Sequence, residues 1–153
     1  MATACVAATE NDSDTLLETM RELYRYDGIE FDEARQRPAL VRLLRDGSLG
    51  RAFLIRDDDR AVGHIFLTFD YGLEYGGREV WIDELFVREE VRGRGIGAAA
   101  IRFVEEICRS WDVRALHLGV AIANRRAIAF YLKNGFGDPD RYMLTKIVSP
   151  RER

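Results

Sequence analysis

The chain has 153 residues, of which 47% are hydrophobic and 32% charged, and its formal net charge is −3. This length supports one sizeable core, so we expect a single domain over residues 1–153. The acidic balance gives no basis for nucleic-acid binding, and no apolar run is long enough to span a bilayer. The first residues lack a signal-peptide pattern. We therefore expect a cytoplasmic protein that binds neither nucleic acid nor membrane.

Cysteines and histidines are too few for metal or thiol chemistry. Cys5 and Cys108 are the only cysteines, and their spacing is not that of metal ligands or of a disulfide framework. No metal is therefore expected. His64 and His117 each lie in an expected strand, where we interpret them as hydrogen-bonded sheet histidines rather than catalytic groups.

The first half of the chain predicts a strand, two helices and a hairpin. Residues 3–8 form the first strand, and Ser13 is a candidate N-cap for a helix with apolar side chains at helical spacing. The range 32–46 indicates a second helix, either continuous or divided at Pro38. Two strands rich in branched and aromatic residues follow, at 51–56 and 61–69.

The second half alternates strands with helices. After a turn at residues 75–78, the expected elements are a strand at 79–87, a helix at 95–110, a strand at 114–120, a helix at 124–134 and a strand at 142–148. The helix at 124–134 has the clearest end signals, with Asn124 at its N-cap, Gly135 at the left-handed C-cap position and Phe136 beyond it. This order of elements is that of a mixed α/β domain.

Arginine and glycine alternate in the segment Arg92-Gly93-Arg94-Gly95-Ile96-Gly97, between an expected strand and the next helix. Glycines let the backbone approach a ligand, and a helix N-terminus directs unpaired N–H groups and the positive end of its dipole at one place. This arrangement suits a pyrophosphate, with further charge from Arg88, Arg92 and Arg94. A tight turn with solvated arginines explains the same pattern. The spacing is neither that of a P-loop nor that of the dinucleotide fingerprint.

The spacing of Arg92, Gly95 and Gly97 after the strand Trp81–Val87 resembles the acetyl-CoA signature of GNAT-superfamily N-acetyltransferases. The resemblance extends from Asn124 through Tyr131 to Phe136 and covers nearly the whole chain. It implies acetyl-CoA as co-substrate and a twisted, mostly antiparallel sheet flanked by about four helices. In that fold the fourth and fifth strands are parallel and splay at the cofactor site. Homodimers are common in the family, so a homodimer is possible.

The same resemblance implies that main-chain groups carry most of the acetyl-CoA binding. The implied contacts are Leu85, Phe86 and Val87 along the pantetheine arm; Arg92, Gly93, Arg94, Gly95, Ile96, Gly97 and Ala98 at the pyrophosphate; and Asn124, Arg126, Ala127 and Tyr131 beyond them. The chemistry of the glycine segment also favours main-chain binding, because glycines and a helix N-terminus bind ligands through N–H groups.

Two adjacent acids, Asp83 and Glu84, interrupt an apolar strand. Attack on a thioester needs a neutral amine, and alkyl amines have pKa values near ~10, so a carboxylate must remove a proton, directly or through water. Strand alternation sends the two side chains to opposite faces, and we expect one of them to act as the base. Polyamine-acetylating members carry the pair in reverse order, so the choice between Asp83 and Glu84 stays open.

Tyr131 lies seven residues after Asn124 and matches the tyrosine that protonates the departing CoA thiolate in many family members. Its spacing with Ile128 and Leu132 fits a buried helix face equally well. We carry Tyr131 as the predicted general acid. Backbone N–H groups at residues 85–87 are candidates for polarising the thioester carbonyl.

The range 10–33 contains nine acids and two bases. In the family the first two helices border the acceptor site, so we hypothesise a small cationic acceptor such as a polyamine, a diamine or an aminoglycoside. A solvated helix face explains the same charges. The alternatives are a protein N-terminal or lysine acetyltransferase and a non-catalytic acyl-CoA-binding or regulatory domain. The aromatic segment 71–75 fits a substrate wall, a dimer contact or a plain hairpin loop.

Overall fold

The computed structural model describes residues 3–149, which divide into two compact units between Gly119 and Val120. The first unit holds a sheet and three α-helices, and the second holds one α-helix. Within the described residues, every helix is too short or too polar to cross a bilayer. The cytoplasmic location and the possible homodimer stay predictions.

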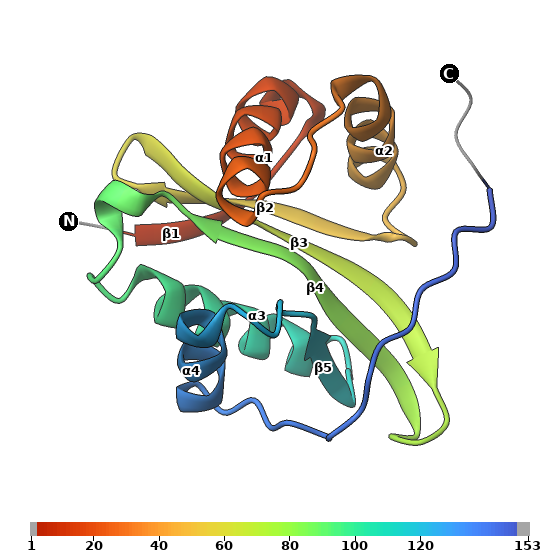
Figure 1. Ribbon diagram of the computed structural model, residues 1–153. Coiled ribbons are helices and arrows are strands. Elements are labelled where there is room, and N and C mark those ends of the chain that lie inside the picture. Colours follow the sequence, from red (N-terminus) through yellow and green to blue (C-terminus); the bar gives the residue numbers. More distant parts are fainter. Residues whose placement is uncertain (1–2, 150–153) are drawn as a thin grey trace. The chain divides into compact units, whose positions relative to one another are not determined.

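The first unit is built on a five-stranded sheet in the order β1-β2-β3-β4-β5 (Figure 1). Its elements are β1 (Thr3–Ala7), α1 (Ser13–Asp27), α2 (Glu33–Arg45), β2 (Gly50–Asp57), β3 (Arg60–Gly72), β4 (Gly77–Val87), α3 (Ile96–Ser110) and β5 (Ala115–Leu118). Neighbouring strands are antiparallel except for β4 and β5, which are parallel. The predicted mixed α/β fold with one parallel pair is confirmed.

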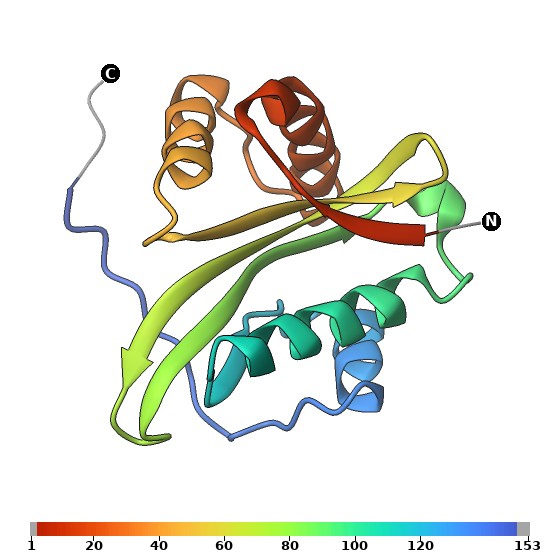
Figure 2. The same ribbon diagram turned by 180° about the vertical axis from the view of Figure 1, so that it is seen from behind.

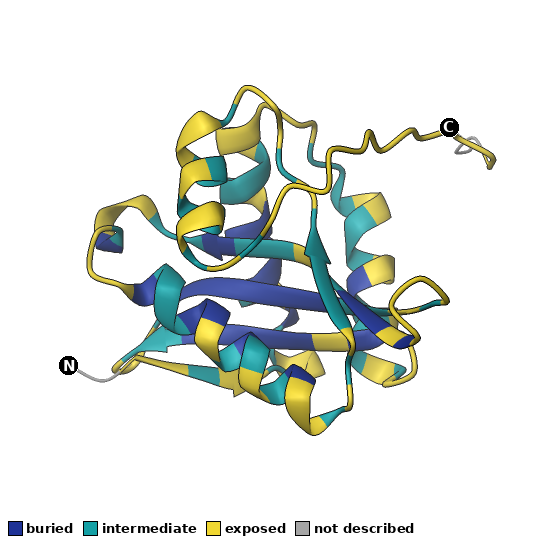
Figure 3. Cartoon of the chain, turned by 90° about the horizontal axis from the view of Figure 1, so that it is seen from below, coloured by how far each residue is buried: buried dark blue, intermediate teal, exposed yellow. Residues whose placement is uncertain are grey.

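Helices cover both faces of this sheet. Helices α1 and α2 lie on one face and α3 on the other (Figures 1 and 2). The core under α1 and α2 consists of Leu16, Leu17, Met20, Leu40, Ala52, Leu54 and Phe66. On the α3 side, Phe53 meets Phe103 edge to face with ring centroids 4.9 Å apart. The middle strands are accordingly the most continuously buried part of the chain (Figure 3).

The ends of α1 and α2 follow from local capping. Asp12, rather than Ser13, is the N-cap of α1, after a short 3-10 turn, and Gly28 ends this helix with φ of 69°. The Asp32 side chain accepts from the Ala34 N–H at 3.1 Å at the start of α2. Helix α2 is continuous through Pro38, so the alternative of two pieces is wrong: a proline removes only one N–H, and its fixed φ is helical.

The second unit contains α4 (Arg125–Lys133), whose predicted end signals are confirmed. The Asn124 side chain accepts from the Ala127 N–H at 3.1 Å, and Gly135 has φ of 98°. Beyond it, the Phe136 N–H donates to the Tyr131 carbonyl at 3.1 Å. These bonds pair backbone groups that the helix itself leaves unpaired.

The expected last strand at residues 142–148 is wrong. These residues have no regular secondary structure, and Tyr142 and Leu144 are 87% and 91% exposed. A strand needs a neighbouring strand to pair its N–H and C=O groups, and within residues 3–149 the sheet ladders do not include this segment. Its branched and aromatic composition predicted a strand but could not supply a partner.

Candidate active site

Strand β4 contains a bulge at Asp83. On one side of the bulge Ile82 pairs with Leu67, and on the other Glu84 pairs with Phe66, which leaves Asp83 as an extra residue. An extra residue shifts the alternation of side chains by one position. Glu84 therefore shares the α1 face of the sheet with Phe66, while Ile82 shares the α3 face with Leu67. The strict alternation expected around the two acids does not hold here.

Both carboxylate oxygens of Glu84 have partners. His64 Nε2 lies 2.9 Å from Oε1, and the Tyr24 hydroxyl donates to Oε2 at 3.0 Å. The Glu84 side chain is 11% exposed, and His64 is fully buried. Two partners, one on α1 and one on β3, hold the two oxygens and restrict the rotation of this carboxyl group. It retains lone pairs that could accept a proton.

Asp83 and Asp27 lie within the electrostatic reach of Glu84. Loss of solvent, followed by the charge of Glu84, raises the pKa of Asp83. The same two causes raise the pKa of Asp27 at the end of α1, where Arg92 opposes them. Burial and then the nearby Glu84 charge raise the pKa of Tyr24, so its hydroxyl stays protonated and remains a donor. The charge of Glu84 thus acts on two further carboxyl groups, Asp83 and Asp27.

The glycine segment forms a left-handed turn that feeds α3. Gly93 and Gly95 have φ of 82° and 81°, and Gly95 is the N-cap of α3 with no side-chain capping bond. A Cβ at either position would meet open space, so the left-handed backbone, rather than crowding within the protein, requires glycine there. The first turn, which includes Ile96, Gly97 and Ala98, presents N–H groups that have no partner within the helix. These donors can bind a phosphate oxygen.

Three arginines near this segment are engaged by the protein itself. Their partners are Glu18 and Glu22 for Arg88 at 2.8 and 3.1 Å, the Val87 carbonyl for Arg92 at 2.8 Å, and Asp57 for Arg94 at 3.5 Å. Two carboxylates balance the charge of Arg88, whose side chain is only 13% exposed, and its contribution to a pyrophosphate site stays a prediction. The available donors are mainly the backbone N–H groups.

The C-terminal part of β4 has one edge that β5 does not cover. The parallel ladder with β5 runs from Glu79 to Ile82, whereas the ladder with β3 continues to Val87. Main-chain groups of a strand alternate between its two edges. Leu85 and Val87 therefore present N–H and C=O groups toward the side where β5 has ended, as expected for strands that splay, while Phe86 pairs with β3.

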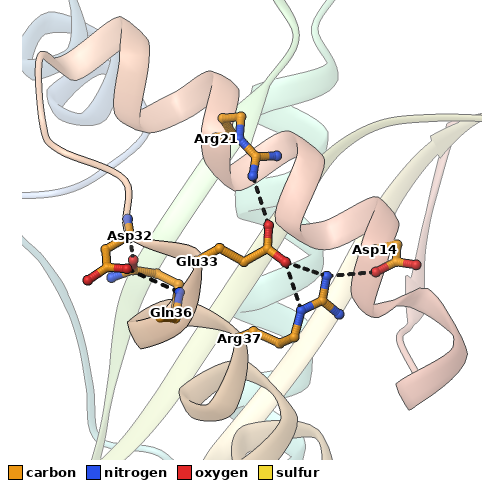
Figure 4. Close-up of polar contacts among 7 residues, drawn as sticks. Asp14, Arg21, Asp32, Glu33, Gln36 and Arg37 are labelled. Carbon is orange, nitrogen blue, oxygen red and sulfur yellow. Dashed lines mark hydrogen bonds and ion pairs between the residues drawn. The ribbon is translucent and has the colours of Figure 1, made fainter.

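Most acids in the range 10–33 are paired with arginines. The pairs are Glu10–Arg45, Asp14–Arg37, Glu18–Arg88, Glu22–Arg88, Asp32–Arg35, Glu33–Arg21 and Glu33–Arg37, at N–O distances of 2.7 to 3.5 Å. Figure 4 shows Glu33 between Arg21 and Arg37, with Asp14 on the far side of Arg37. Most of these arginines lie outside the range 10–33. The expected acidic rim is therefore much reduced, and Asp27 is the acid of this range that lies near Glu84.

The remaining histidine and the cysteines have other environments. His117 Nε2 lies 2.8 Å from Oε1 of the buried Glu79, at the opposite end of β4 from Glu84. Burial raises the pKa of both Cys5 and Cys108 to about 11, which disfavours thiolate chemistry. Within residues 3–149, the His, Cys, Asp and Glu side chains do not form a group of three or more that could hold a metal ion.

Four of the predicted site residues lie in the second unit: Asn124, Arg126, Ala127 and Tyr131. Asn124 and Ala127 are joined by the N-cap bond of α4, so the Asn124 side chain has a structural role there. The Tyr131 ring packs edge to face against Phe130 and Phe136, with centroids 5.2 and 5.6 Å away. The roles of these residues toward acetyl-CoA stay predictions.

The model of the acetyltransferase (GNAT) family matches residues 15–136, a range that includes Glu84, the glycine segment and Tyr131. The chain belongs to the GNAT acetyltransferase family. Members of this family use acetyl-CoA as acetyl donor. The signature segment of this GNAT chain lies between β4 and α3, and its role in binding the donor stays a prediction.

Relatives of this GNAT chain include acetyltransferases with different acceptors. It is 28% identical over 134 residues to an uncharacterised N-acetyltransferase of Methanocaldococcus jannaschii, covering 86% of this chain and 59% of the relative. It is 32% identical over 77 residues to the thialysine N-epsilon-acetyltransferase of Bos taurus, covering 50% and 45%. It is 28% identical over 129 residues to the aminoalkylphosphonate N-acetyltransferase of Salmonella typhimurium, covering 84% and 81%. The chain thus spans only about half the length of the first two relatives.

A solved structure has the same fold at a similar level of identity. An integron cassette protein from the mobile metagenome of Cole Harbour Salt Marsh superposes with a TM-score of 0.85 and 32% identity, covering 96% of this GNAT chain and 91% of the other. Such a likeness supports the arrangement of strands and helices described above. This likeness does not indicate which acceptor the chain uses.

The site also contains Thr19, Tyr24 and His64, which the sequence pattern does not predict as site residues. The interpretation of His64 as a hydrogen-bonded sheet histidine is correct, but one of its partners is the candidate base. Tyr24 falls on the apolar face that helical spacing predicts for α1. Neither spacing nor composition signals these contacts, because 60 positions separate Tyr24 from Glu84 along the chain.

Proposed function

We propose that this GNAT chain is an acetyl-CoA-dependent N-acetyltransferase whose acceptor is a small cationic primary amine. One observation carries the proposal: β4 presents a fixed carboxylate at Glu84 and an uncovered edge at Leu85–Val87, and it leads directly to the uncapped N-terminus of α3. A proton acceptor, strand-edge groups and phosphate donors therefore follow one another along one stretch of backbone.

The proposed reaction is direct transfer. The neutral amine nitrogen of the acceptor attacks the thioester carbonyl carbon, a C–N bond forms, and the C–S bond then breaks to release CoA thiolate. Glu84 takes the proton that the amine loses, directly or through a water, and Tyr131 supplies a proton to the thiolate sulfur. Main-chain N–H groups within Leu85–Val87 stabilise the negative charge that develops on the carbonyl oxygen.

Acetyl-CoA binding is proposed to rest on backbone groups. The N–H groups from Gly93 to Ala98, including Arg94 and Ile96, face the pyrophosphate, and the positive end of the α3 dipole adds to the attraction. Arg92 contributes by holding the Val87 carbonyl, since its Nε donates to it at 2.8 Å. This bond ties the glycine segment to the end of β4.

The acceptor class is proposed from the charges near Glu84. Asp27 and Asp83 lie within the field of Glu84, and Asp27 also ends α1, where the helix dipole is negative. Such a place attracts a cation. The relatives alone do not decide the acceptor, because one is named for thialysine and another for an aminoalkylphosphonate, which carries an anionic group.

A panel of amines assayed by CoA thiol release tests the acceptor class. Putrescine and spermidine are expected to exceed butylamine in kcat/KM by roughly tenfold at low salt, because a second ammonium gains Coulomb energy from the carboxylates. The advantage should shrink with added salt, and Asp27→Asn should reduce it for putrescine but not for butylamine. Since the pKa of Asp27 and that of Asp83 are raised, both lose charge at a higher pH than ordinary aspartates, so the preference should weaken early on acidification.

Other outcomes of the panel point elsewhere. Turnover of peptides alone would identify a protein acetyltransferase, and preferred turnover of an aminoalkylphosphonate would identify an anionic acceptor. Tight CoA binding without turnover of any amine would support a regulatory domain. Each of these results contradicts the proposed acceptor class.

Replacing Tyr131 with phenylalanine tests the proposed general acid. The variant is expected to lower kcat by roughly tenfold to a hundredfold while the Kd of CoA changes little, because only the proton donor is lost. Tyr142→Phe is the matched control, since Tyr142 lies in the same unit and is 87% exposed. Equal turnover in the wild type and the Tyr131 variant would remove Tyr131 from the acid role.

A further inference from the structure

A buried chain of hydrogen bonds leads from α1 through His64 to Glu84. The Thr19 hydroxyl lies 2.7 Å from His64 Nδ1, and His64 Nε2 lies 2.9 Å from Glu84 Oε1. Thr19 and His64 are both fully buried. Buried polar groups need partners, and here each ring nitrogen has one. The proposed base is therefore connected to a side chain in the middle of α1.

The sheet places His64 and Glu84 diagonally on one face. His64 is paired across the strands with Phe86, and Glu84 is paired with Phe66, which leaves the two polar side chains as diagonal neighbours. The His64 ring stacks on Phe66 with centroids 4.5 Å apart and an interplanar angle of 23°. This packing restricts rotation of the imidazole. It therefore keeps Nε2 directed at Glu84.

The hydrogen-bond partners of His64 restrict which of its ring nitrogens carry a proton. When Thr19 donates to Nδ1, the neutral ring carries its proton on Nε2 and donates it to Glu84. When Thr19 instead donates to the Leu16 carbonyl, which lies 3.0 Å away, Nδ1 must carry the proton, and the contact with Glu84 needs a second proton. Only the first arrangement is complete with a neutral imidazole and an ionised carboxylate.

We propose that His64 is the positioning residue of Glu84: its Nε2–H holds Oε1, and Thr19 fixes the ring tautomer, so that Glu84 remains a carboxylate oriented toward the acceptor amine. The Tyr24 hydroxyl holds the other oxygen. This inference rests on the proposed function, because it assigns a role to His64 through Glu84. His64 itself touches neither the thioester nor the amine in this proposal.

Other charged and titratable groups act on this place from each element packed around it. They are Tyr24 and Asp27 on α1, Arg35 on α2, Asp83 on β4, and Arg92 after β4. The charge of Glu84 acts on Asp27 and Asp83, while Arg35 acts on Tyr24 and Arg92 acts on Asp27. The two hydrogen-bond donors, His64 and Tyr24, thus supply the direct contacts that hold both oxygens of the Glu84 side chain.

Nuclear magnetic resonance can test the contact without any acceptor. The chain has two histidines, so ¹⁵N-labelled histidine gives two imidazole spin systems, which His64→Gln and His117→Gln assign. Glu84→Gln is expected to move the Nε2 signal of His64 only. Glu79→Gln is the matched control and should move His117 only, because that pair has nearly the same N–O distance of 2.8 Å. Thr19→Val should change the tautomer signature of His64, and Thr19→Ser should preserve it.

Kinetics with putrescine test the role. Asparagine places its amide near the position of Nδ1, and glutamine near that of Nε2, so only His64→Gln keeps a donor for Glu84. His64→Asn is expected to lower kcat/KM at neutral pH roughly tenfold and to move the acid-side midpoint of the pH profile upward by about one unit. The KM for acetyl-CoA should not change. His64→Gln and the control His117→Asn should keep the wild-type midpoint.

The outcomes separate this inference from the proposed function. If no amine reacts but Glu84→Gln moves the His64 signal and the pH titration of the Glu84 ¹³C carboxyl signal moves upward in His64→Asn, the function fails and the positioning role stands. If putrescine reacts and both His64 variants share the wild-type midpoint, the positioning role is overturned. A His64 signal that ignores Glu84→Gln overturns it with or without turnover. A purely structural role predicts equal rescue by asparagine and glutamine, with no movement of the midpoint.

Discussion

Replacing Glu84 with glutamine should lower kcat at least a hundredfold while acetyl-CoA still binds. General base catalysis typically contributes about 10²–10⁴ in rate, and an amide cannot take a proton from the acceptor amine. The substitution keeps the shape of the side chain, and its amide oxygen can still accept from Tyr24 or His64. The loss should therefore appear in kcat rather than in the KM of acetyl-CoA. Steady-state assays of thiol release above and below neutral pH measure it.

Asp83→Asn is the matched control for this substitution. Asp83 is adjacent in sequence but is the extra residue of the bulge, and the network that holds Glu84 does not include it. Its loss should cost less than tenfold in kcat and act mainly on the KM of a cationic acceptor. A larger loss of kcat in the Asp83 variant than in the Glu84 variant would assign the base to Asp83. Equal, small losses in both would indicate that neither carboxylate is the base.

Replacing Gly95 with alanine should raise the KM of acetyl-CoA about tenfold or more. Gly95 has φ of 81°, and that left-handed region costs an L-residue roughly 1–2 kcal/mol. A small rotation of the turn relieves this strain but redirects the N–H groups at the start of α3. Those groups are the proposed pyrophosphate donors, so their altered direction should weaken the binding of acetyl-CoA. Calorimetric titration with CoA separates binding from turnover.

Gly76→Ala provides a matched control. Gly76 has φ of 83° and, like Gly95, open space where a Cβ would project, but it lies in the hairpin between β3 and β4. Both variants should lose similar thermal stability, while only the Gly95 variant should lose affinity for CoA. If both variants bind CoA as tightly as the wild type, the backbone-donor interpretation is contradicted. If both lose affinity to the same extent, the cause is a general loosening of the fold.

Much of the fold could be predicted because its signals are local. The capping of α4 by Asn124 and the left-handed position of Gly135 depend on a few neighbouring residues, and a sequence displays them directly. The order of strands and helices likewise follows from hydrophobic periodicity. The segment 142–148 shows where this stops: it has the composition of a strand, yet pairing requires a partner that composition does not specify.

The predicted acidic rim of the acceptor site is the part of the sequence analysis that the structure changed most. The range 10–33 is rich in acids, but arginines at positions 35, 37, 45 and 88 pair with most of them. A count along the chain ignores partners that folding brings from elsewhere, and electrostatic interactions depend on distance in space. The expected acidic rim therefore narrowed to Asp27 and the acids of β4.

The sequence by itself indicated the family and proposed the segment 92–97 as the donor site, because glycines before a helix N-terminus let backbone N–H groups approach a phosphate. It also identified Asp83 and Glu84 as the two acids worth weighing. Only the tertiary structure showed how the surroundings of these two acids differ. The bulge at Asp83 places Glu84 on the α1 face, where His64 and Tyr24 hold its carboxylate at 2.9 and 3.0 Å. A one-residue shift in strand pairing reverses which face a side chain occupies, and such a shift is set by the packing of whole strands and helices.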